Sequence, residues 1–244
     1  MEFNNTEVWG FEHAFRGMRN PKNSWDKSDS FNCLDTEGEH CSKFCKNYDT
    51  EKCFLYGVFA TPFVIGNNDM KLAQTLIKAG SEHRKFMRQI FVSVDITAPL
   101  FWWKEFDTYK VGTVRNSCST MHKIDVKEFD YDDFTHLGID ECGLKSAFNE
   151  YLMVLENLRC NFNETKEKKY WRALIEMLPD GFNMKATVTF DYENLLGMCS
   201  KGQRRFHKLS EWSGIDYPTE PSFITWARTL PYAQELIFID ELDK

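Results

Sequence analysis

The sequence lacks the features of a membrane or exported protein. Its 244 residues contain no run of about 18 apolar side chains, the length that a membrane-spanning helix needs. The first residues, Met1–Asn5, include neither a basic stretch nor an apolar one, so no secretory signal is predicted. We therefore expect a cytoplasmic protein whose eight cysteines stay mostly reduced.

Two further absences, of excess positive charge and of the common nucleotide-binding motifs, exclude some classes of function. The chain has no excess of positive charge, because 30 lysine and arginine residues stand against 37 acidic ones and give a net charge of −7. This balance argues against broad binding to nucleic acid, but it leaves room for a local basic pocket that holds one phosphorylated metabolite. There is also no Gly-x-Gly-x-x-Gly motif and no Walker motif, so neither a dinucleotide-binding Rossmann site nor a P-loop is supported.

The chain does have enough apolar and aromatic residues for one sizeable core. Hydrophobic residues make up 42% of the sequence and aromatic residues 15%, with 21 phenylalanines. Such rings fill a core, and they also line pockets that stack planar ligands. A chain of this length requires no second domain, so residues 1–244 are predicted to form a single domain.

Hydrophobic periodicity predicts helices and strands after a loop-rich start. Residues 1–68 are interpreted as loop-rich because turn-forming residues crowd positions 17–30. Helical spacing, strand alternation and helix start and stop signals follow in residues 69–244, the predicted core. The expected helices are 69–79, a segment starting at Pro99, 144–162, 166–177, 191–199 and 222–239 with a break at Pro231, and the expected strands are 90–96 and 186–190. This order predicts an α/β (or α+β) fold.

The densest group of polar and aromatic residues runs from His83 to His122. It opens with three cations and a histidine in the run His83–Arg88, and it ends with the run Thr108–His122, which supplies hydroxyl groups, a glycine and further cations. A phosphate requires cations, hydroxyls and backbone N–H groups that converge where glycine lets the chain come close. The segment is interpreted as a phosphate-binding region, and the alternative is a solvated basic turn beside a core strand.

Residues 69–122 resemble the central segment of the flavin-dependent thymidylate synthases. In that family a helix ending in glycine precedes a strand, then a short helix, then the signature Arg-His-Arg-x-x-Ser-x-Asn-Glu-x-Ser-x-Arg-Tyr. The run Ala98-Pro99-Leu100-Phe101 is similar to the start of that short helix, and Thr108-Tyr109-Lys110 occupies the Arg-His-Arg position. With one extra residue allowed, Asn116 matches the signature Asn, Ser117 takes the place of its Glu, and Ser119 matches its last Ser.

A second stretch, residues 172–196, is similar to another pattern of the family. That pattern is a helix ending Leu-Pro, a strand, and a helix that starts Asn-x-Arg-x-Leu. Here Asp191 takes the Asn position and Glu193 takes the Arg position. The family then carries an arginine that meets the nucleotide, and the run Lys201–Lys208 offers Arg204 and Arg205 for that role, with the register left open.

The resemblance implies a fold, a chemistry and an assembly. The fold is a central mixed sheet flanked by helices, and the assembly is a homotetramer with active sites between subunits. The family methylates a pyrimidine deoxynucleotide, deoxyuridylate, by one-carbon transfer that uses reduced flavin (FAD), a nicotinamide reductant and a methylenefolate donor. Carried over by position, the flavin contacts would be His83, Arg84, Arg88, Tyr109 and Lys110, and the nucleotide contacts would be Arg115, Asn116, Ser117, Ser119, Arg204 and Arg205.

The altered signature leaves a second hypothesis open. Thr-Tyr-Lys brings one cation where Arg-His-Arg brings up to three, and two lost charge-assisted contacts of about 1.5–3 kcal/mol each would weaken cofactor binding by several orders of magnitude. His83, Arg84 and Arg88 are the side chains expected to compensate. If they do not, the chain is a non-catalytic protein that binds a nucleotide or another ligand on the same scaffold without flavin chemistry.

Four cysteines form a cluster near the start of the chain. Cys33, Cys41, Cys45 and Cys53 have the spacing C-x7-C-x3-C-x7-C. Four thiolates in such a short stretch have the number and chemistry to hold zinc, but the paired C-x2-C knuckles of strong zinc motifs are absent. A loop with reduced, partly buried thiols is favoured, and a third hypothesis is a zinc-stabilised interaction protein built around this cluster.

Overall fold

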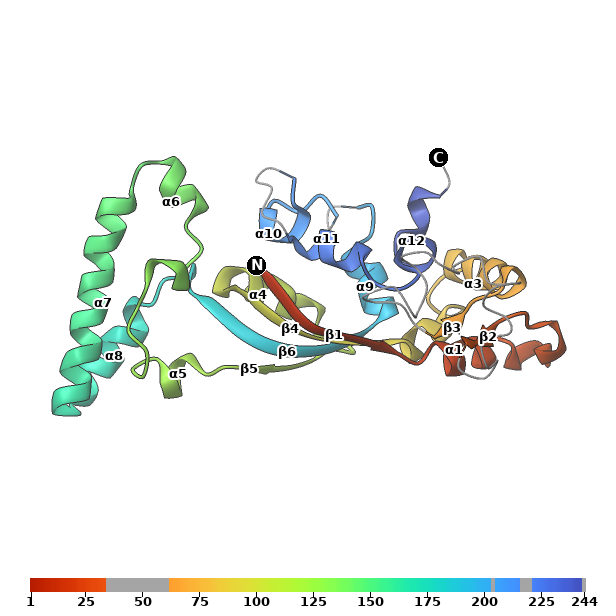
Figure 1. Ribbon diagram of the computed structural model, residues 1–244, viewed down its shortest axis with the longest axis horizontal. Helices are drawn as coiled ribbons and strands as arrows, with labels where there is room; N and C mark the ends of the chain where they lie inside the picture. Colours follow the sequence, from red (N-terminus) through yellow and green to blue (C-terminus); the bar gives the residue numbers. More distant parts are fainter. Residues whose placement is uncertain (34–61, 203–204, 216–220, 243–244) are drawn as a thin grey trace. The chain divides into compact units, whose positions relative to one another are not determined.

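A computed structural model gives the fold of the chain and describes residues 1–33, 62–202, 205–215 and 221–242 (Figure 1). The chain divides into two compact units. The first unit comprises Met1–Glu2, Ile96–Thr108 and Asn116–Thr187, and the second comprises Phe3–Asp95, Tyr109–Arg115 and Val188–Lys244. The single-domain organisation expected from the sequence stays a prediction.

Four strands form one sheet in the order β1 (Glu2–Trp9), β4 (Phe91–Pro99), β6 (Asn183–Asp191) and β5 (Val114–Ser117). The central strands β4 and β6 run in opposite directions, because the N–H of Tyr192 donates to the carbonyl of Ile90 and the N–H of Leu100 donates to that of Phe182, at 3.0 Å in both cases. The α/β fold class is confirmed. One detail differs from the expectation, since the sheet is antiparallel where a mixed sheet was predicted.

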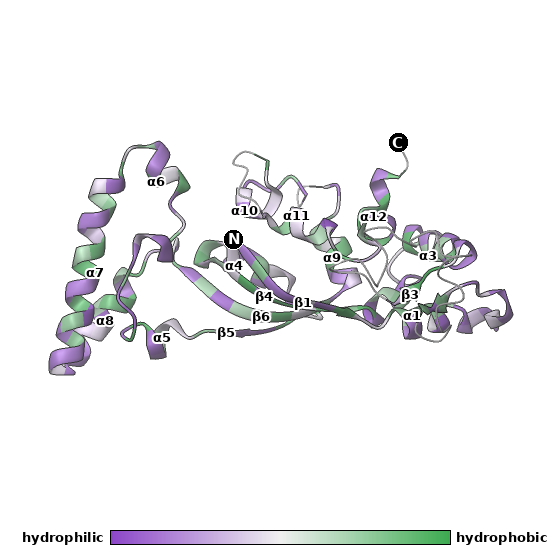
Figure 2. Cartoon of the chain, viewed as in Figure 1, coloured by the Kyte–Doolittle hydropathy of each residue, from purple (hydrophilic) through white to green (hydrophobic). Residues whose placement is uncertain are grey.

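The two central strands show the alternation that the sequence predicts. Buried residues occupy every second position of each strand, and Figure 2 shows apolar residues recurring along both. Because successive side chains of a strand point to opposite faces, each strand presents one apolar face to the core. The buried residues are Val92, Val94, Ile96 and Ala98 in β4 and Met184, Ala186, Val188 and Phe190 in β6.

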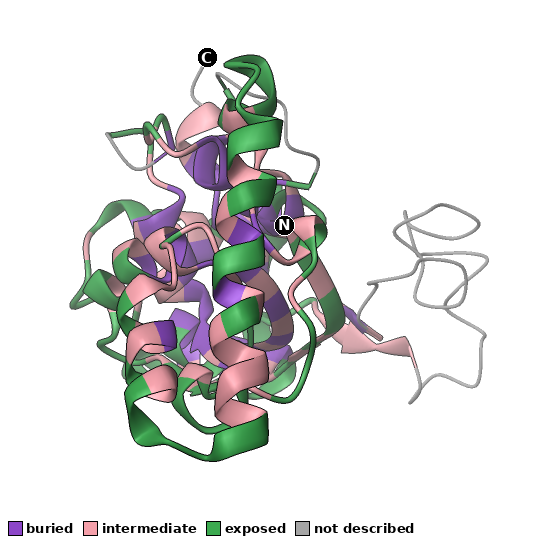
Figure 3. Cartoon of the chain, turned by 90° about the vertical axis from the view of Figure 1, so that its left-hand side faces the viewer, coloured by how far each residue is buried: buried purple, intermediate pink, exposed green. Residues whose placement is uncertain are grey.

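The first unit has its own core among helices. α7 (Lys145–Thr165) packs on α8 (Lys168–Met177), and the segment between β5 and α7 contains α5 (Thr120–Lys123) and α6 (Leu137–Glu141). Exposed residues follow the outer side of α7 in Figure 3. The buried side chains that these parts bring together are Ile124, Phe134, Leu152, Leu155 and Leu174.

A short helix in the same unit carries three buried aromatic side chains. α4 (Leu100–Phe106) begins directly after Pro99, and it buries Trp102, Trp103 and Phe106. The indole Nε1 of Trp103 donates a hydrogen bond of 2.9 Å to the carbonyl of Met184 in β6. A buried indole N–H needs a hydrogen-bond acceptor, and this bond provides one for Trp103. The ring is therefore buried without an unsatisfied polar group.

The second unit contains the remaining elements. Its helices are α1 (Phe11–Met18), α3 (Asn67–Lys78), α9 (Tyr192–Met198), α10 (Ser210–Ser213), α11 (Phe223–Arg228) and α12 (Ala233–Leu236), and β2 (Phe31–Asn32) pairs with β3 (Phe63–Val64). The rings of Tyr192 and Tyr232 both meet the ring of Phe11 edge-on, with centroids 5.5 and 5.6 Å away. Segments from the start and the end of the chain thus share one aromatic core.

A buried ion pair anchors α3 within the second unit. Asp69, in the first turn of α3, has no exposed surface, and the Nε of Arg19 donates to its Oδ1 at 2.6 Å. The hydroxyls of Ser28 and Ser30 donate to its Oδ2 at 2.6 and 2.5 Å. Burial acts to raise the pKa of Asp69, but the donated hydrogen bonds and the arginine outweigh burial, so that pKa lies below its ordinary value. The carboxylate is therefore ionised and fully paired.

Most of the expected elements are confirmed. α3, β4, α4, α7, α8, β6 and α9 all lie where the periodicity placed them, and the segment 222–239 holds α11 and α12 with the expected break at Pro231 between them. The start of the chain differs, because residues expected to be loop-rich form β1 and α1. Within the described ranges, no helix combines the length and apolar character that a bilayer span needs.

Candidate functional site

A pocket of about 650 Å³ opens on the loop between α9 and α10. The described residues that line it are Lys201, Gly202, Phe206, His207 and Lys208. Two of these side chains are cationic and none is acidic. Phe206 is 59% exposed, so its ring is available to a ligand rather than committed to the core. The pocket therefore combines positive charge with one accessible aromatic face.

Aromatic rings pack against His207, one of the wall residues of the pocket. The buried ring of Trp212 lies 5.7 Å from that of His207 and 5.3 Å from that of Tyr109, centroid to centroid. The Nδ1 of His207 accepts a hydrogen bond of 3.0 Å from the N–H of Leu209. One of the residues predicted to contact flavin, Tyr109, is thus packed on the same indole as a wall residue of the pocket.

The two arginines expected in this segment have different outcomes. Arg204 lies outside the described residues. Arg205 is buried, and its Nη2 and Nη1 pair with Asp240 at 2.6 Å and with Glu241 at 2.9 Å, while its Nε donates to the carbonyl of Cys199 at 2.9 Å. All three guanidinium nitrogens are engaged within the protein. We therefore revise the role of Arg205 from ligand binding to holding the end of the chain against the pocket loop.

Low pH should weaken the attachment of Asp240 and Glu241 to Arg205. Arg228 donates to Glu241, and together with Arg205 it lowers the pKa of Glu241 to about 2 against partial burial. A carboxylate with a lowered folded pKa stabilises the protein above its unfolded pKa of about 4.3, and that contribution disappears as the pH falls toward 2. The shift corresponds to at most about 3 kcal/mol, and solvent screening reduces it to on the order of 2 kcal/mol.

We expect Glu241→Gln to remove this pH dependence. Urea unfolding of the wild-type protein between pH 6 and pH 3 should show a steeper loss of stability than the variant shows. Parallel curves for the two proteins would mean that Glu241 does not carry the effect.

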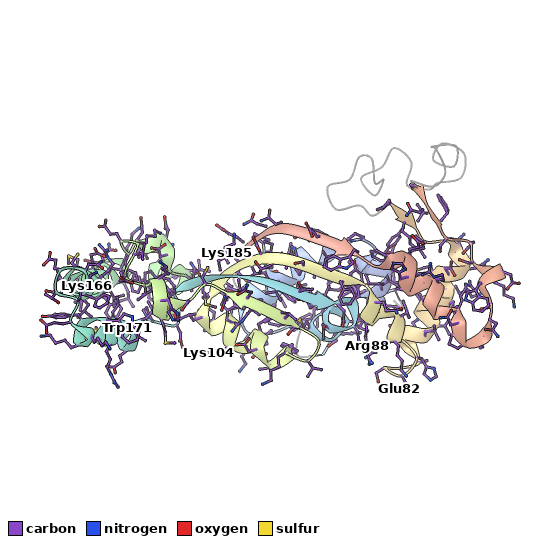
Figure 4. All side chains as sticks on the ribbon, turned by 90° about the horizontal axis from the view of Figure 1, so that it is seen from below. Glu82, Arg88, Lys104, Lys166, Trp171 and Lys185 are labelled. Carbon is purple, nitrogen blue, oxygen red and sulfur yellow. The ribbon has the colours of Figure 1, made fainter. Side chains whose placement is uncertain are left out.

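Arg84 and Arg88 meet one carboxylate. The Nε of Arg84 donates to Oε1 of Glu193 at 2.9 Å, and the Nε of Arg88 donates to its Oε2. Arg88, labelled in Figure 4, lies in the turn η4 (Lys85–Gln89) just before β4, while Glu193 lies in the first turn of α9. Hydrogen bonding and attraction from the arginines lower the pKa of Glu193 despite its burial. The resemblance implies a cation at the position of Glu193, and the sequence gave no sign that Glu193 is the acidic partner of the two arginines. Their role as flavin contacts stays a prediction.

The loop that carries Tyr109 and Lys110 closes against the same helix. The side-chain amide of Asn194 donates to the carbonyl of Val111 at 2.8 Å. Gly112 has a φ of +81°, and an added Cβ would come within 3.2 Å of the Asn194 amide oxygen, so a larger residue would strain this contact. The exposed Lys110 and the half-buried Tyr109 are thus held in place by α9.

The remaining predicted contacts are surface residues. His83 is exposed in the turn after α3, and Arg115 is half-buried on β5. Asn116 and Ser117 are exposed on β5, and the hydroxyl of Ser119 caps α5 by accepting the N–H of His122 at 3.1 Å. Asn116, Ser117 and Ser119 belong to the first unit, whereas the pocket and the arginine pair belong to the second. Their roles as nucleotide contacts stay predictions.

The cysteine cluster falls mostly outside the described residues. Cys41, Cys45 and Cys53 are not described, and Cys33 is a half-buried thiol next to β2. Among the residues that the structure does describe, no group of three or more His, Cys, Asp or Glu side chains is arranged to hold a metal ion. The zinc hypothesis stays a prediction about residues 33–53.

Comparison with known proteins places this geometry on a known scaffold. No family model matches the sequence, and no curated protein matches it. The flavin-dependent thymidylate synthase ThyX from Helicobacter pylori, solved with FAD and dUMP, is similar over 98% of this chain and 99% of that one, with a TM-score of 0.58 and 12% identity. The chain has the fold of a flavin-dependent thymidylate synthase.

A second H. pylori ThyX structure with FAD and dUMP agrees. It is similar over the full length of both chains, again with a TM-score of 0.58 and 12% identity. The resemblance inferred from residues 69–122 and 172–196 is therefore confirmed at the level of the thymidylate synthase fold.

Proposed function

We propose that this chain binds a pyrimidine nucleotide in the pocket formed by Lys201, Gly202, Phe206, His207 and Lys208. The observation that carries the proposal is the combination of two lysines with an exposed aromatic ring around one cavity of about 650 Å³. A mononucleotide has matching parts, because its phosphate needs cationic and N–H donors and its base needs a flat apolar face.

In this proposal, most wall residues of the pocket have a role. The ammonium groups of Lys201 and Lys208 would bind the phosphate. The ring of Phe206 would stack on the base. Among the residues that the structure describes, none beyond the immediate chain neighbours of Gly202 has an atom within 4 Å of the place that its Cβ would take, so the backbone at this point leaves space for the ligand.

The choice of a pyrimidine base rests on the scaffold. Two structures with this fold, both of H. pylori ThyX, are complexes with dUMP and FAD. The fold of this chain extends over their whole length, which supports a related ligand for this chain. The resemblance also implies a homo-oligomer, which we propose for this chain and which light scattering would test.

Substitution of the pocket lysines tests the proposal. We expect the Kd for dUMP, measured by calorimetry, to rise about tenfold for each of Lys201→Ala and Lys208→Ala, because a charge-assisted contact contributes about 1.5 kcal/mol. Lys104→Ala is the matched control, since Lys104 is an exposed lysine paired with Asp180 in the first unit. Deoxyuridine, which differs from dUMP only in lacking the phosphate, should bind weakly to all four proteins. Equal Kd values for dUMP in the wild-type protein and the lysine variants would refute the proposal.

The one-carbon transfer implied by the resemblance requires a bound flavin. The residues at the expected flavin site do not fit that group, because both arginines meet Glu193 and the signature cations are replaced by Thr108-Tyr109-Lys110. We therefore derive no catalytic step through flavin and favour nucleotide binding without flavin chemistry. An absorbance spectrum of freshly purified protein tests this preference, since a flavin band near 450 nm, on the order of one flavin per chain, would restore the enzymatic hypothesis.

A further inference from the structure

Arg84 and Arg88 form an arrangement that ordinarily binds an external anion. Two guanidinium groups converge on the two oxygens of a single carboxylate, that of Glu193. The side chains of Arg84 and Arg88 are 28% and 50% exposed, so the pair lies within reach of a dissolved ligand. Converging arginines with such access are the usual means of holding a phosphate or carboxylate.

Glu193 occupies the position that such an anion would take. Its side chain is only 14% exposed, and each of its oxygens accepts a bond from a different arginine. A carboxylate on the same chain competes at a high effective concentration, so a dissolved anion has to displace it before it meets either guanidinium. The pKa of Arg88 is raised, first by its bond to Glu193, which agrees with a tight pair.

The neighbouring charges reinforce this competition. Asp191, which caps α9, adds a second carboxylate beside Glu193, and repulsion between the two contributes to a raised pKa of Asp191, with burial the larger cause. Glu82, paired with Lys85, also acts on Arg88. When all are ionised, three cations and three carboxylates give a net charge of zero at this corner: Arg84, Arg88 and Lys85 against Glu193, Asp191 and Glu82. A ligand with a diphosphate would therefore meet no net attraction here.

We propose that Glu193 is an internal anion that fills the arginine pair and determines specificity by excluding diphosphate ligands such as FAD from it. The proposal concerns a different site from the nucleotide pocket, which lies on the 201–208 loop. It predicts a gain of binding on substitution, because both arginines become available when the carboxylate is removed.

The test compares variants of the full chain with inorganic pyrophosphate and FAD as probes. We expect Glu193→Ala to bind both probes at least tenfold more tightly than the wild-type protein, with FAD followed by quenching of its fluorescence and pyrophosphate by calorimetry. Glu193→Gln keeps the size of the side chain and removes its charge, so it should show a smaller gain in the same direction. The double variant E193A/R88A should lose the gain. Glu176→Ala, which breaks the exposed pair of Arg172 and Glu176 on α8, should change nothing.

Two outcomes would overturn the proposal. One is a folded Glu193→Ala protein, judged by circular dichroism, with wild-type affinity for both probes. If that variant fails to fold, unchanged affinity in Glu193→Gln decides the matter in the same way. The other is tight FAD binding by the wild-type protein that Arg88→Ala abolishes. The affinity for dUMP, measured on the same variants, reports on the 201–208 pocket separately, so a failure of one proposal is distinguishable from a failure of the other.

Discussion

Replacement of Asp69 by alanine should lower the free energy of unfolding by about 3–5 kcal/mol, the cost of leaving one partner of a buried ion pair alone. The guanidinium of Arg19 is 5% exposed and would lose its carboxylate, and the hydroxyls of Ser28 and Ser30 would lose their acceptor. Asp69→Asn should also be destabilising, because the amide keeps the shape but not the charge. Urea denaturation followed by circular dichroism measures both.

The pH dependence of this ion pair has a defined sign. The pKa of Asp69 is lowered in the folded protein, so its contribution is fully present above the unfolded pKa of about 3.9 and is lost as the pH falls below it. The difference in stability between the wild-type protein and Asp69→Asn should therefore be largest near neutral pH and shrink in acid. Glu12→Ala is the control, since Glu12 is 52% exposed in a pair with Arg16 and should cost no more than about 0.5 kcal/mol. A cost for Asp69→Ala as small as that of the control would contradict the assignment.

Arg205→Ala should have the next largest effect, a loss of about 3–4 kcal/mol in the free energy of unfolding. The substitution leaves Asp240 and Glu241 without their buried cation and the carbonyl of Cys199 without its donor. For a chain of this size, such a loss corresponds to a fall in Tm of about 6–16 °C. Differential scanning calorimetry provides the measurement.

The same variant separates two roles for Arg205. If the side chain holds the chain end, Arg205→Ala lowers Tm strongly, and Arg172→Ala, which removes a cation that is 77% exposed, leaves it nearly unchanged. If Arg205 instead contacted the nucleotide, as the sequence suggested, its removal would weaken dUMP binding while Tm stayed close to the wild-type value. Comparison of the change in Tm with the change in dUMP affinity therefore decides between the two roles: a large fall in Tm supports the structural role, and weaker dUMP binding at an unchanged Tm supports nucleotide contact.

The central elements could be predicted because their signals are local. The alternation in β4 and β6 is visible within nine residues, and Asp191 is a helix cap whose Oδ1 accepts the N–H of Asn194 at 2.8 Å, three positions away. Such short-range rules need no knowledge of the rest of the fold. They gave the positions of most helices and of the two central strands.

β1 could not be predicted because its alternation is interrupted. Asn5 has a φ of +52°, in the left-handed region that asparagine tolerates, and the half-buried positions change from odd to even there, with Phe3 before it and Thr6 and Val8 after it. A period of two therefore fails within the strand. The polar residues around Asn5 therefore predict a loop, although the segment forms an edge strand.

The candidate site was only partly predictable from the sequence, because some of its features are local and others depend on residues far apart in the chain. The basic run from Lys201 to Lys208 is evident in the sequence, and five of its residues, Lys201, Gly202, Phe206, His207 and Lys208, line the pocket. The partners that give the arginines their roles are far away in the chain: Glu193 is 109 residues from Arg84, and Glu241 is 36 residues from Arg205. Sequence position identified cations near the site, but only the fold shows which of them already have a carboxylate.

The contact between the two ends of the second unit bears on how the chain folds during synthesis. The ring of Phe3 stacks on Trp226 with centroids 4.9 Å apart, and the indole Nε1 of Trp226 donates to the hydroxyl of Thr6 at 3.2 Å. β1 therefore waits for the synthesis of α11 before its aromatic residue is covered. Such a long wait slows folding and keeps an uncovered strand edge in solution. Chaperone binding to ribosome-bound chains should consequently persist until α11 has emerged.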